Sequence, residues 1–193
     1  MVEKIERIET TLTFLNCLVG ERRWEIMKKD NEIFLVSIVW HQRWPYMEPI
    51  EATCNESGHS KHPDFNADCG IHAYKSGHDT SLDVSVNTFY GSVYLWGKMI
   101  EHENGYRSEF AYPKDFRLEK CCVCDNDIKH AFWLDVTNRL DITSRTCLSQ
   151  FNNLKLLITF CINHHPIWDC PSSSNIVELE NIIKELKALY LLK

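Results

Sequence analysis

The residues best suited to chemistry in this 193-residue sequence are its nine cysteines and nine histidines, most of which gather into two groups. Cys121 and Cys124 are separated by two residues, and so are Cys161 and His164. Two ligands separated by two residues can bind the same metal ion, and a tetrahedral zinc ion needs two such pairs. We therefore predict a structural zinc site at Cys121, Cys124, Cys161 and His164, with His165 as the alternative to His164.

The 36 residues between Cys124 and Cys161 exceed the usual spacing of a compact zinc ribbon. Loop-closure entropy grows only logarithmically with length, so the insert does not prevent the two pairs from meeting. Four protein ligands leave no open coordination position, which favours a structural over a catalytic role. The alternative interpretation is that Cys121 and Cys161 are small buried hydrophobic residues, as free cysteines often are.

A second group of metal-binding residue types comprises Cys54, His62, Cys69 and His72. It lies in and just after a stretch rich in Asn, Ser, Gly, Asp and Pro that has neither helical nor strand periodicity, so something must order it. A second zinc bound by Cys54, His62 and Cys69, with His59 or His72 as the fourth ligand, would supply that order. The alternative is a set of surface histidines beside two core thiols.

Two smaller sets resemble catalytic groups. An imidazole activates a neighbouring thiolate, so Cys69 and His72 are a candidate nucleophile and base. Glu103 can pair with Arg107 across the Asn104-Gly105 turn, although a charged, solvent-facing hairpin is the favoured interpretation of these residues. Neither an orienting third group nor a glycine-rich phosphate loop is identifiable, so the sequence favours a protein without catalytic activity.

Aromatic residues are the candidates for ligand recognition. On a small barrel they could stack a base or enclose a cation, although ordinary core packing is the alternative. The aromatic residues considered are Trp40, Trp44, Tyr46, Trp96 and Tyr106. The predicted ligand-binding residues are Trp96, Arg107, Glu103 and Trp44.

The elements that must position these residues are mostly strands. Runs of β-forming residues over 11–15, 33–40, 70–74, 91–100 and 106–112 predict strands, with Asn104-Gly105 as a hairpin turn and Pro113 closing the last strand. Residues 175–192 carry apolar side chains at helical spacing, with Asn175 and Glu178 as a capping box.

The predicted fold class is α+β: a small antiparallel β-sheet or partly closed barrel, then a zinc-stabilised segment and a C-terminal amphipathic helix. We expect a β-rich domain over 1–115 and the zinc-binding segment with its helix over 116–193.

Charge and hydropathy argue against a nucleic-acid-binding, exported or membrane protein. The net charge of −6, without a cluster of lysine and arginine, argues against nucleic-acid binding. The first residues, MVEKIERIE, do not resemble an export signal, and the apolar runs fall short of the roughly 20 residues that a spanning helix requires. We therefore expect a cytoplasmic protein with reduced cysteines and no membrane association.

Residues 20–113 resemble a widespread group of small, largely uncharacterised bacterial proteins. The similarity rests on the segments 20–24, 44–45, 52–54, 62–64, 69–73, 91–97 and 101–113, which include CGIHA, LWG and EHENGYRSEFAYP. It covers about half of the chain. The group often has a cysteine two positions before its Cys-Gly-Ile step, where this chain has Ala67. The resemblance implies a β-rich unit over residues 1–115 and implies no particular activity.

These features together predict a non-catalytic, zinc-stabilised binding or adaptor module that recognises a protein or a small ligand. The alternatives are a nucleic-acid-binding zinc protein and a cysteine- or metal-dependent hydrolase. The C-terminal helix is also a candidate surface for a homodimer, with packing on the protein's own core as the alternative.

Overall fold

The computed structural model describes residues 8–38, 42–54, 62–77, 89–118, 124, 126–136, 153–160 and 176–192. The strands within these ranges are β1 (Ile8–Leu12), β2 (Leu18–Lys29), β3 (Glu32–Ser37), β4 (Ile50–Glu51), β5 (Ile71–Tyr74), β6 (Phe89–Glu101), β7 (Gly105–Arg117), β8 (His130–Asp135), β9 (Leu154–Phe160) and β10 (Ile176–Glu178). The helical elements are the 3-10 turn η1 (Phe14–Asn16) and the helix α2 (Leu179–Leu189).

The described strands form one mostly antiparallel sheet, which confirms the expected α+β class. Their order is β1-β6-β7-β5-β2-β9-β8-β10, with β3 paired to β2 and β4 paired to β7. An additional pairing of β6 with β2 joins β2, β5, β7 and β6 into a partial ring. The chain divides into two compact units. The first comprises Met1–Arg22, Pro45–Leu82 and Gly91–Asp115, and the second Arg23–Trp44, Asp83–Tyr90 and Phe116–Lys193.

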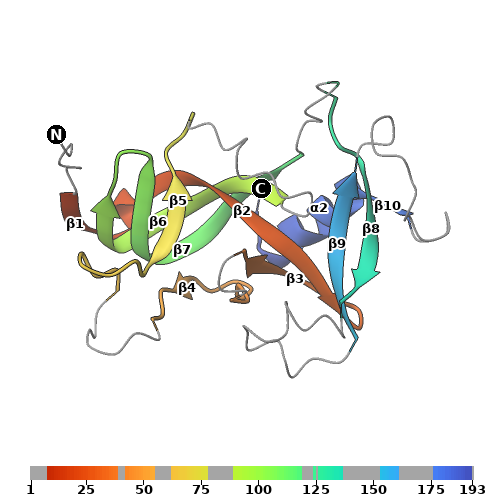
Figure 1. Ribbon diagram of the computed structural model, residues 1–193, viewed down its shortest axis with the longest axis horizontal. Helices are drawn as coiled ribbons and strands as arrows, with labels where there is room; N and C mark the ends of the chain where they lie inside the picture. The colour runs from red at the N-terminus through yellow and green to blue at the C-terminus, as the bar shows by residue number, and fades with distance from the viewer. Residues whose placement is uncertain are drawn as a thin grey trace. The chain divides into compact units, whose positions relative to one another are not determined.

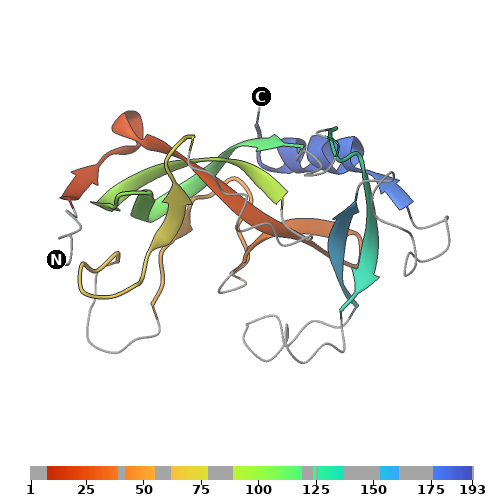
Figure 2. The same ribbon diagram turned by 45° about the horizontal axis from the view of Figure 1, so that its top comes forward.

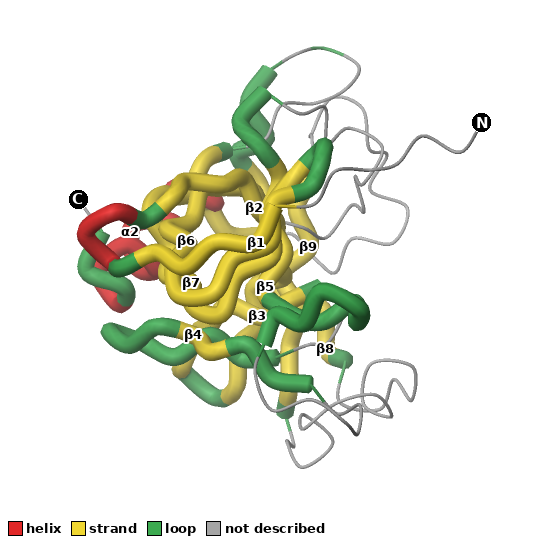
Figure 3. Tube along the Cα trace, turned by 90° about the vertical axis from the view of Figure 1, so that its left-hand side faces the viewer, coloured by secondary structure: helices red, strands yellow, loops and turns green. Residues whose placement is uncertain are grey.

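The first unit is built around the β6–β7 hairpin, whose connection contains the predicted Asn104-Gly105 turn. Figure 3 shows β1, β6, β7 and β5 running side by side. In β6, Val93 and Leu95 are buried, whereas Tyr94 and Trp96 are partly exposed. Successive side chains of a strand point to opposite faces. One face of β6 therefore contributes to the core, and the other presents aromatic rings.

The second unit has an aromatic core. The ring of Trp24 lies edge-on to Trp44 at 5.5 Å and to Phe116 at 5.6 Å, and Phe116 contacts Tyr190 at 6.1 Å. Figure 2 shows α2 continuing directly from β10. The helix buries its apolar face, which consists of Leu179, Ile182 and Leu186. This face packs inside the chain, so a homodimer through α2 stays an untested prediction.

Two strands of the second unit were not predicted from the sequence. β8 and β9 pair antiparallel from His130↔Phe160 to Asp135↔Lys155, and Figure 1 shows them side by side. β9 also pairs with β2 from Met27↔Leu156 to Lys29↔Leu154. These pairings link residues 23–44 to the C-terminal part of the chain within the second unit. The predicted domain division near residue 115 stays a prediction.

Two local expectations were wrong. Pro113 does not close a strand, because β7 continues to Arg117. The described pairings of β7 with β5 and β4 extend no further than Ala111, so a residue without an N–H is tolerated beyond that point. The capping box also fails, because Glu178 is the last residue of β10 and the N-cap of α2, with no side-chain capping bond. Pairing of β10 with β8 holds this segment extended.

Candidate metal centre

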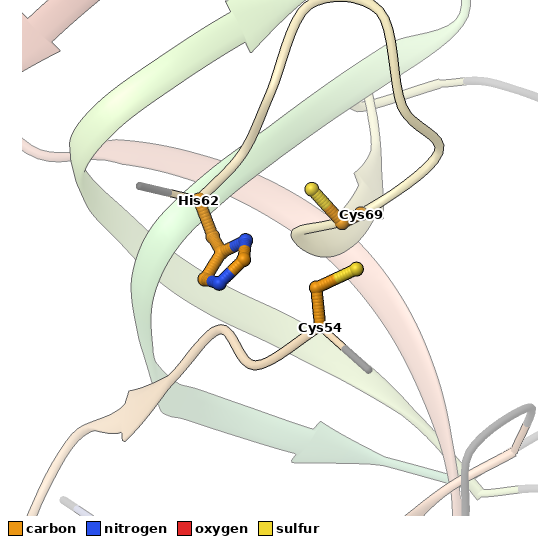
Figure 4. A group of neighbouring side chains, drawn as sticks. All are labelled: Cys54, His62 and Cys69. Carbon is orange, nitrogen blue, oxygen red and sulfur yellow. The ribbon is translucent and has the colours of Figure 1, made fainter. Parts of the chain in front are cut away.

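Three of the four residues in the second predicted metal group converge. The ligand atoms of Cys54, His62 and Cys69 all lie within 4.8 Å of one another. Figure 4 shows the three side chains beside one another, contributed by two segments of the chain. Cys54 follows β4, whereas His62 and Cys69 lie in the segment that leads into β5.

Strand β7 positions both segments. β4 pairs with it through Ile50↔Ala111 and Glu51↔Phe110, and β5 through a register that begins at Ile71↔Ser108. The backbone N–H of Ala52 extends the first pairing with a 2.7 Å bond to the carbonyl of Glu109. Because each ligand segment adjoins a strand fixed to β7, the thiols of Cys54 and Cys69 are brought together although they are far apart in the sequence.

Local hydrogen bonds surround the side chain of Cys69. Its side chain is buried, and the backbone N–H of Asp64 donates to its Sγ at 3.2 Å. Asp64 Oδ1 in turn accepts a 2.8 Å bond from the N–H of Asn66, which closes a tight turn. Burial raises the pKa of the Cys69 thiol, and the Asp64 N–H partly opposes this effect. A metal ion would remove the remaining cost of ionisation, because it binds the thiolate directly.

Arg107 of β7 also holds the segment that contains Cys69, and its side chain is only 2% exposed. Its Nη1 donates to the carbonyl of Ala67 and, at 3.2 Å, to the carbonyl of Cys69. Its Nε donates to His102 Nε2 at 2.9 Å. Arg107 therefore lies inside the first unit rather than on an exposed ligand-binding surface.

His72 does not belong to the converging group. It occupies an exposed position of β5, where its neighbours Ile71 and Ala73 are buried. Its Nε2 lies 3.9 Å from Asp68 Oδ1, and its carbonyl accepts a bond from Arg22. The strand alternation thus turns His72 away from the core side of β5. The other candidate for a fourth ligand, His59, lies outside the described residues.

Two thiolates and one imidazole fit zinc well. Zinc binds cysteine sulfur and histidine nitrogen in tetrahedral sites, whereas magnesium and calcium require oxygen ligands. The N–H to sulfur bond at Cys69 and the buried arginine behind its backbone form the kind of outer layer that orients metal ligands. Cys54, His62 and Cys69 would hold the ion, which would order the segment that carries them.

The first predicted zinc site falls mostly outside the described part of the chain. Of its members only Cys124 is described, and its side chain is half-buried. Cys121, Cys161, His164 and the alternative His165 lie outside the described residues, so this site stays a prediction.

The predicted ligand-binding residues have different surroundings. Trp44 is buried in the core of the second unit, where its Nε1 donates to Ser37 Oγ at 2.9 Å. Glu103 is exposed in the β6–β7 turn. Trp96 is partly exposed on β6. Of the other aromatic candidates, Tyr46 and Tyr106 are partly buried, and Trp40 lies outside the described residues.

Trp96 belongs to an aromatic cluster that the sequence did not reveal. Phe14 of η1 lies edge-on to Trp96 at 5.1 Å and to Tyr94 at 6.2 Å, and Trp96 stacks on Phe110 at 6.0 Å. Phe14 is 56% exposed and the adjacent Leu15 is 92% exposed. The only sequence signal was the apolar pair Phe14-Leu15, which was interpreted as part of a strand.

Comparisons with known proteins add no assignment. No family model, curated protein or solved structure matches the chain. The similarity of residues 20–113 to a bacterial group therefore stays a prediction. Within the described residues, no helix combines the length and apolar character needed to cross a bilayer.

Proposed function

We propose that this protein is a non-catalytic binding module in which a zinc ion at Cys54, His62 and Cys69 rigidifies the surface that recognises a protein partner. The convergence of these three ligand atoms within 4.8 Å is the observation that carries the proposal. Metal binding and ordering of the ligand segment would then be one equilibrium, with a binding free energy on the order of 10 kcal/mol. Reduced cysteines are required, which is consistent with the expected cytoplasmic location.

The aromatic cluster of Phe14, Tyr94, Trp96 and Phe110, together with Leu15, is the proposed recognition surface. Exposed apolar side chains that gather on one face mark interaction sites more often than isolated ones do. Phe14 and Leu15 project from η1, and Lys114 places its Nζ 5.5 Å from the ring of Tyr94. An apolar protein segment with a carboxylate beside its apolar residues would satisfy both features.

A protein segment suits this surface better than a single-stranded nucleic acid does. Base stacking requires accessible ring faces. The ring of Trp96 is already stacked on Phe110 and contacted by Phe14, and the most exposed member, Leu15, is aliphatic. The net charge of −6 also disfavours a polyphosphate backbone.

The proposed mechanism is preorganisation. The zinc centre would fix the segment that follows β4 and the segment that precedes β5. Both strands pair with β7, which also carries Phe110 of the cluster. A surface that is rigid before binding loses less conformational entropy when the partner docks. Loss of zinc should therefore weaken partner binding even though no cluster residue is a ligand.

Elemental analysis of the purified full chain tests the metal. Wild type should contain zinc, and Cys54→Ser and Cys69→Ser should each lose about one equivalent. Cys17→Ser is the matched control, because Cys17 is a half-buried free cysteine outside the group. Cys124→Ser reports separately on the site predicted at Cys121, Cys124, Cys161 and His164. A zinc content that Cys54→Ser and Cys69→Ser both leave unchanged would refute the proposed centre.

Selection from a displayed library of random peptides tests the recognition surface. Selected peptides should combine apolar and acidic residues, and Leu15→Ser and Trp96→Ala should weaken their binding by at least about tenfold, as expected for central apolar contacts. Leu191→Ser is the control, because Leu191 is 66% exposed in the second unit. Unchanged peptide affinity in both Leu15→Ser and Trp96→Ala would contradict the proposed recognition surface. Preferential binding of an oligothymidylate would favour the nucleic-acid alternative.

A metal-dependent hydrolase is the second candidate, because the described group supplies three ligands. Two cysteines and one histidine with a water in the fourth position are a known catalytic arrangement of zinc. Cobalt substitution distinguishes the two functions. The visible spectrum of the cobalt protein should be insensitive to azide if a protein side chain supplies the fourth ligand, and a shift on adding azide would favour the hydrolase.

A further inference from the structure

Arg107 is an unusual side chain for the interior of a protein. It lies in β7 opposite His72 of β5 and is 2% exposed. Removing a guanidinium from water is costly unless its donors are satisfied, so arginines are seldom fully buried without partners. The groups that accept hydrogen bonds from the Arg107 guanidinium therefore indicate the role of this residue.

Its contacts concentrate on the segment that presents Cys69. Nη1 donates to the carbonyls of Ala67 and Cys69, and it also lies 3.9 Å from the carboxylate of Asp68. The two carbonyls flank Asp68 in the chain, so one guanidinium nitrogen holds the backbone on both sides of that residue. The planar guanidinium donates to this backbone through Nη1 and to His102 through Nε. A lysine ammonium has no fixed fork that could make both contacts.

The backbone of the segment approaches Arg107 closely. Gly70 has a φ of +117°, and a Cβ there would lie 2.8 Å from Pro63 Cβ and 3.2 Å from Arg107 Cβ. Only glycine satisfies both the conformation and the space at this position. On its other side Arg107 is oriented by His102, whose Nε2 accepts the Nε–H bond at 2.9 Å.

We propose that Arg107 is the positioning residue of the metal centre, holding the Ala67–Cys69 backbone so that the Cys69 thiolate faces Cys54 and His62. The inference rests on the proposed zinc site and assigns that site an outer residue.

The test measures zinc affinity by competition with a chromophoric chelator in the folded full chain. Arg107→Gln should lower the affinity roughly 10- to 100-fold, as substitutions of outer-shell partners do. Arg107→Lys, which keeps the charge but loses the fork, should fall between Arg107→Gln and wild type. Arg22→Gln is the matched control. Arg22 also donates to a backbone carbonyl in this unit, but that carbonyl belongs to His72 and not to the ligand segment.

A purely structural role for Arg107 would lower the unfolding free energy of the metal-free protein and leave the zinc affinity of the folded protein within about threefold of wild type, as for Arg22→Gln. That result would overturn the inference. Wild type that binds no zinc would overturn the proposed function and this inference together. Wild type that binds zinc, with unchanged affinity in both Arg107 variants, would overturn the inference alone.

A measurement on wild type decides the question if neither variant folds. Zinc titration followed by arginine-edited NMR should shift the Nε–H signal of Arg107 more than that of Arg22, because Arg107 donates to the carbonyl of the ligand residue Cys69, whereas Arg22 donates to the carbonyl of His72. An Arg107 signal that zinc does not move would contradict the positioning role.

Discussion

The hydroxyl of Tyr190 donates a 2.9 Å hydrogen bond to the backbone carbonyl of Trp44, a residue 146 positions earlier in the chain. The same oxygen accepts a 3.4 Å bond from the backbone N–H of Leu35. Tyr190 follows α2 directly and is fully buried. One side chain thus connects the end of the helix to β3 and to the segment after it.

Tyr190→Phe should lower the unfolding free energy by about 1–3 kcal/mol, because it leaves a buried carbonyl and a buried N–H without their partner. Urea denaturation followed by tryptophan fluorescence measures this change. Leu191→Ser, at an exposed neighbouring position, should change the stability by less than about 0.5 kcal/mol. Equal stability of Tyr190→Phe and wild type would show that water replaces both bonds.

Glu25 should make the stability depend on pH. Burial raises its pKa from the usual 4.5 to about 7. The folded state therefore binds this proton more tightly than the unfolded state does, and the stability contributed by protonation is fully present below about pH 4.5 and lost as pH rises through about 7. Glu25→Gln cannot ionise, so it should gain on the order of 1–3 kcal/mol over wild type between pH 4.5 and pH 8.

Urea denaturation of both proteins at the two pH values measures this gain. The control is Glu180→Gln, a substitution at an exposed carboxylate in the first turn of α2. It should change the stability by less than about 0.5 kcal/mol, as a substitution at an exposed position. A Glu25→Gln difference that does not grow with pH would contradict the predicted sign.

Gly97 and Gly77 form a matched pair for separating steric from conformational cost. Both have positive φ, +77° and +83°. A Cβ on Gly97 would lie 2.7 Å from Glu109 Oε2 and 2.8 Å from Glu109 Cβ, whereas a Cβ on Gly77 meets nothing within 4 Å. Gly77→Ala should cost about 1 kcal/mol, the conformational cost alone, and Gly97→Ala about 2–4 kcal/mol.

The clash at Gly97 has a further consequence, because Glu109 Oε2 accepts a 2.8 Å bond from the backbone N–H of Lys98. Displacing that carboxylate would leave the N–H without its acceptor. Thermal unfolding of the two alanine variants measures the difference. Equal losses would indicate that the sheet relaxes around the new methyl group.

Chelation should destabilise wild type but not Cys54→Ser. A ligand that binds only the folded state adds about 2.7 kcal/mol when its concentration is 100 times the dissociation constant. The unfolding temperature of wild type should therefore be higher with excess zinc than with excess chelator. For Cys54→Ser, the two unfolding curves should coincide. If the site at Cys121, Cys124, Cys161 and His164 also binds zinc, a residual separation should persist in Cys54→Ser and disappear when Cys124→Ser is added. Coincident curves for wild type would contradict a zinc ion that supports the fold.

Features that depend on near neighbours in the chain could be predicted before the fold was known. The Asn104-Gly105 turn, the alternating strand on either side of it and the apolar stripe of α2 all follow from local backbone preference and periodicity. The sequence also identified Cys54, His62, Cys69 and His72 as candidate metal ligands, because the loop around them has no helical or strand periodicity and needs something to order it.

Which of these residues meet depends on pairing between strands that are distant in the sequence. Pairing of β4 and β5 with β7 brings Cys54 and Cys69 together, and the alternation of β5 turns His72 away. Arg107, expected on a surface, became buried because the ligand segment folds over β7. Long-range hydrogen bonds between strands depend on register, and register is set by the packing of the whole sheet rather than by any short stretch of sequence.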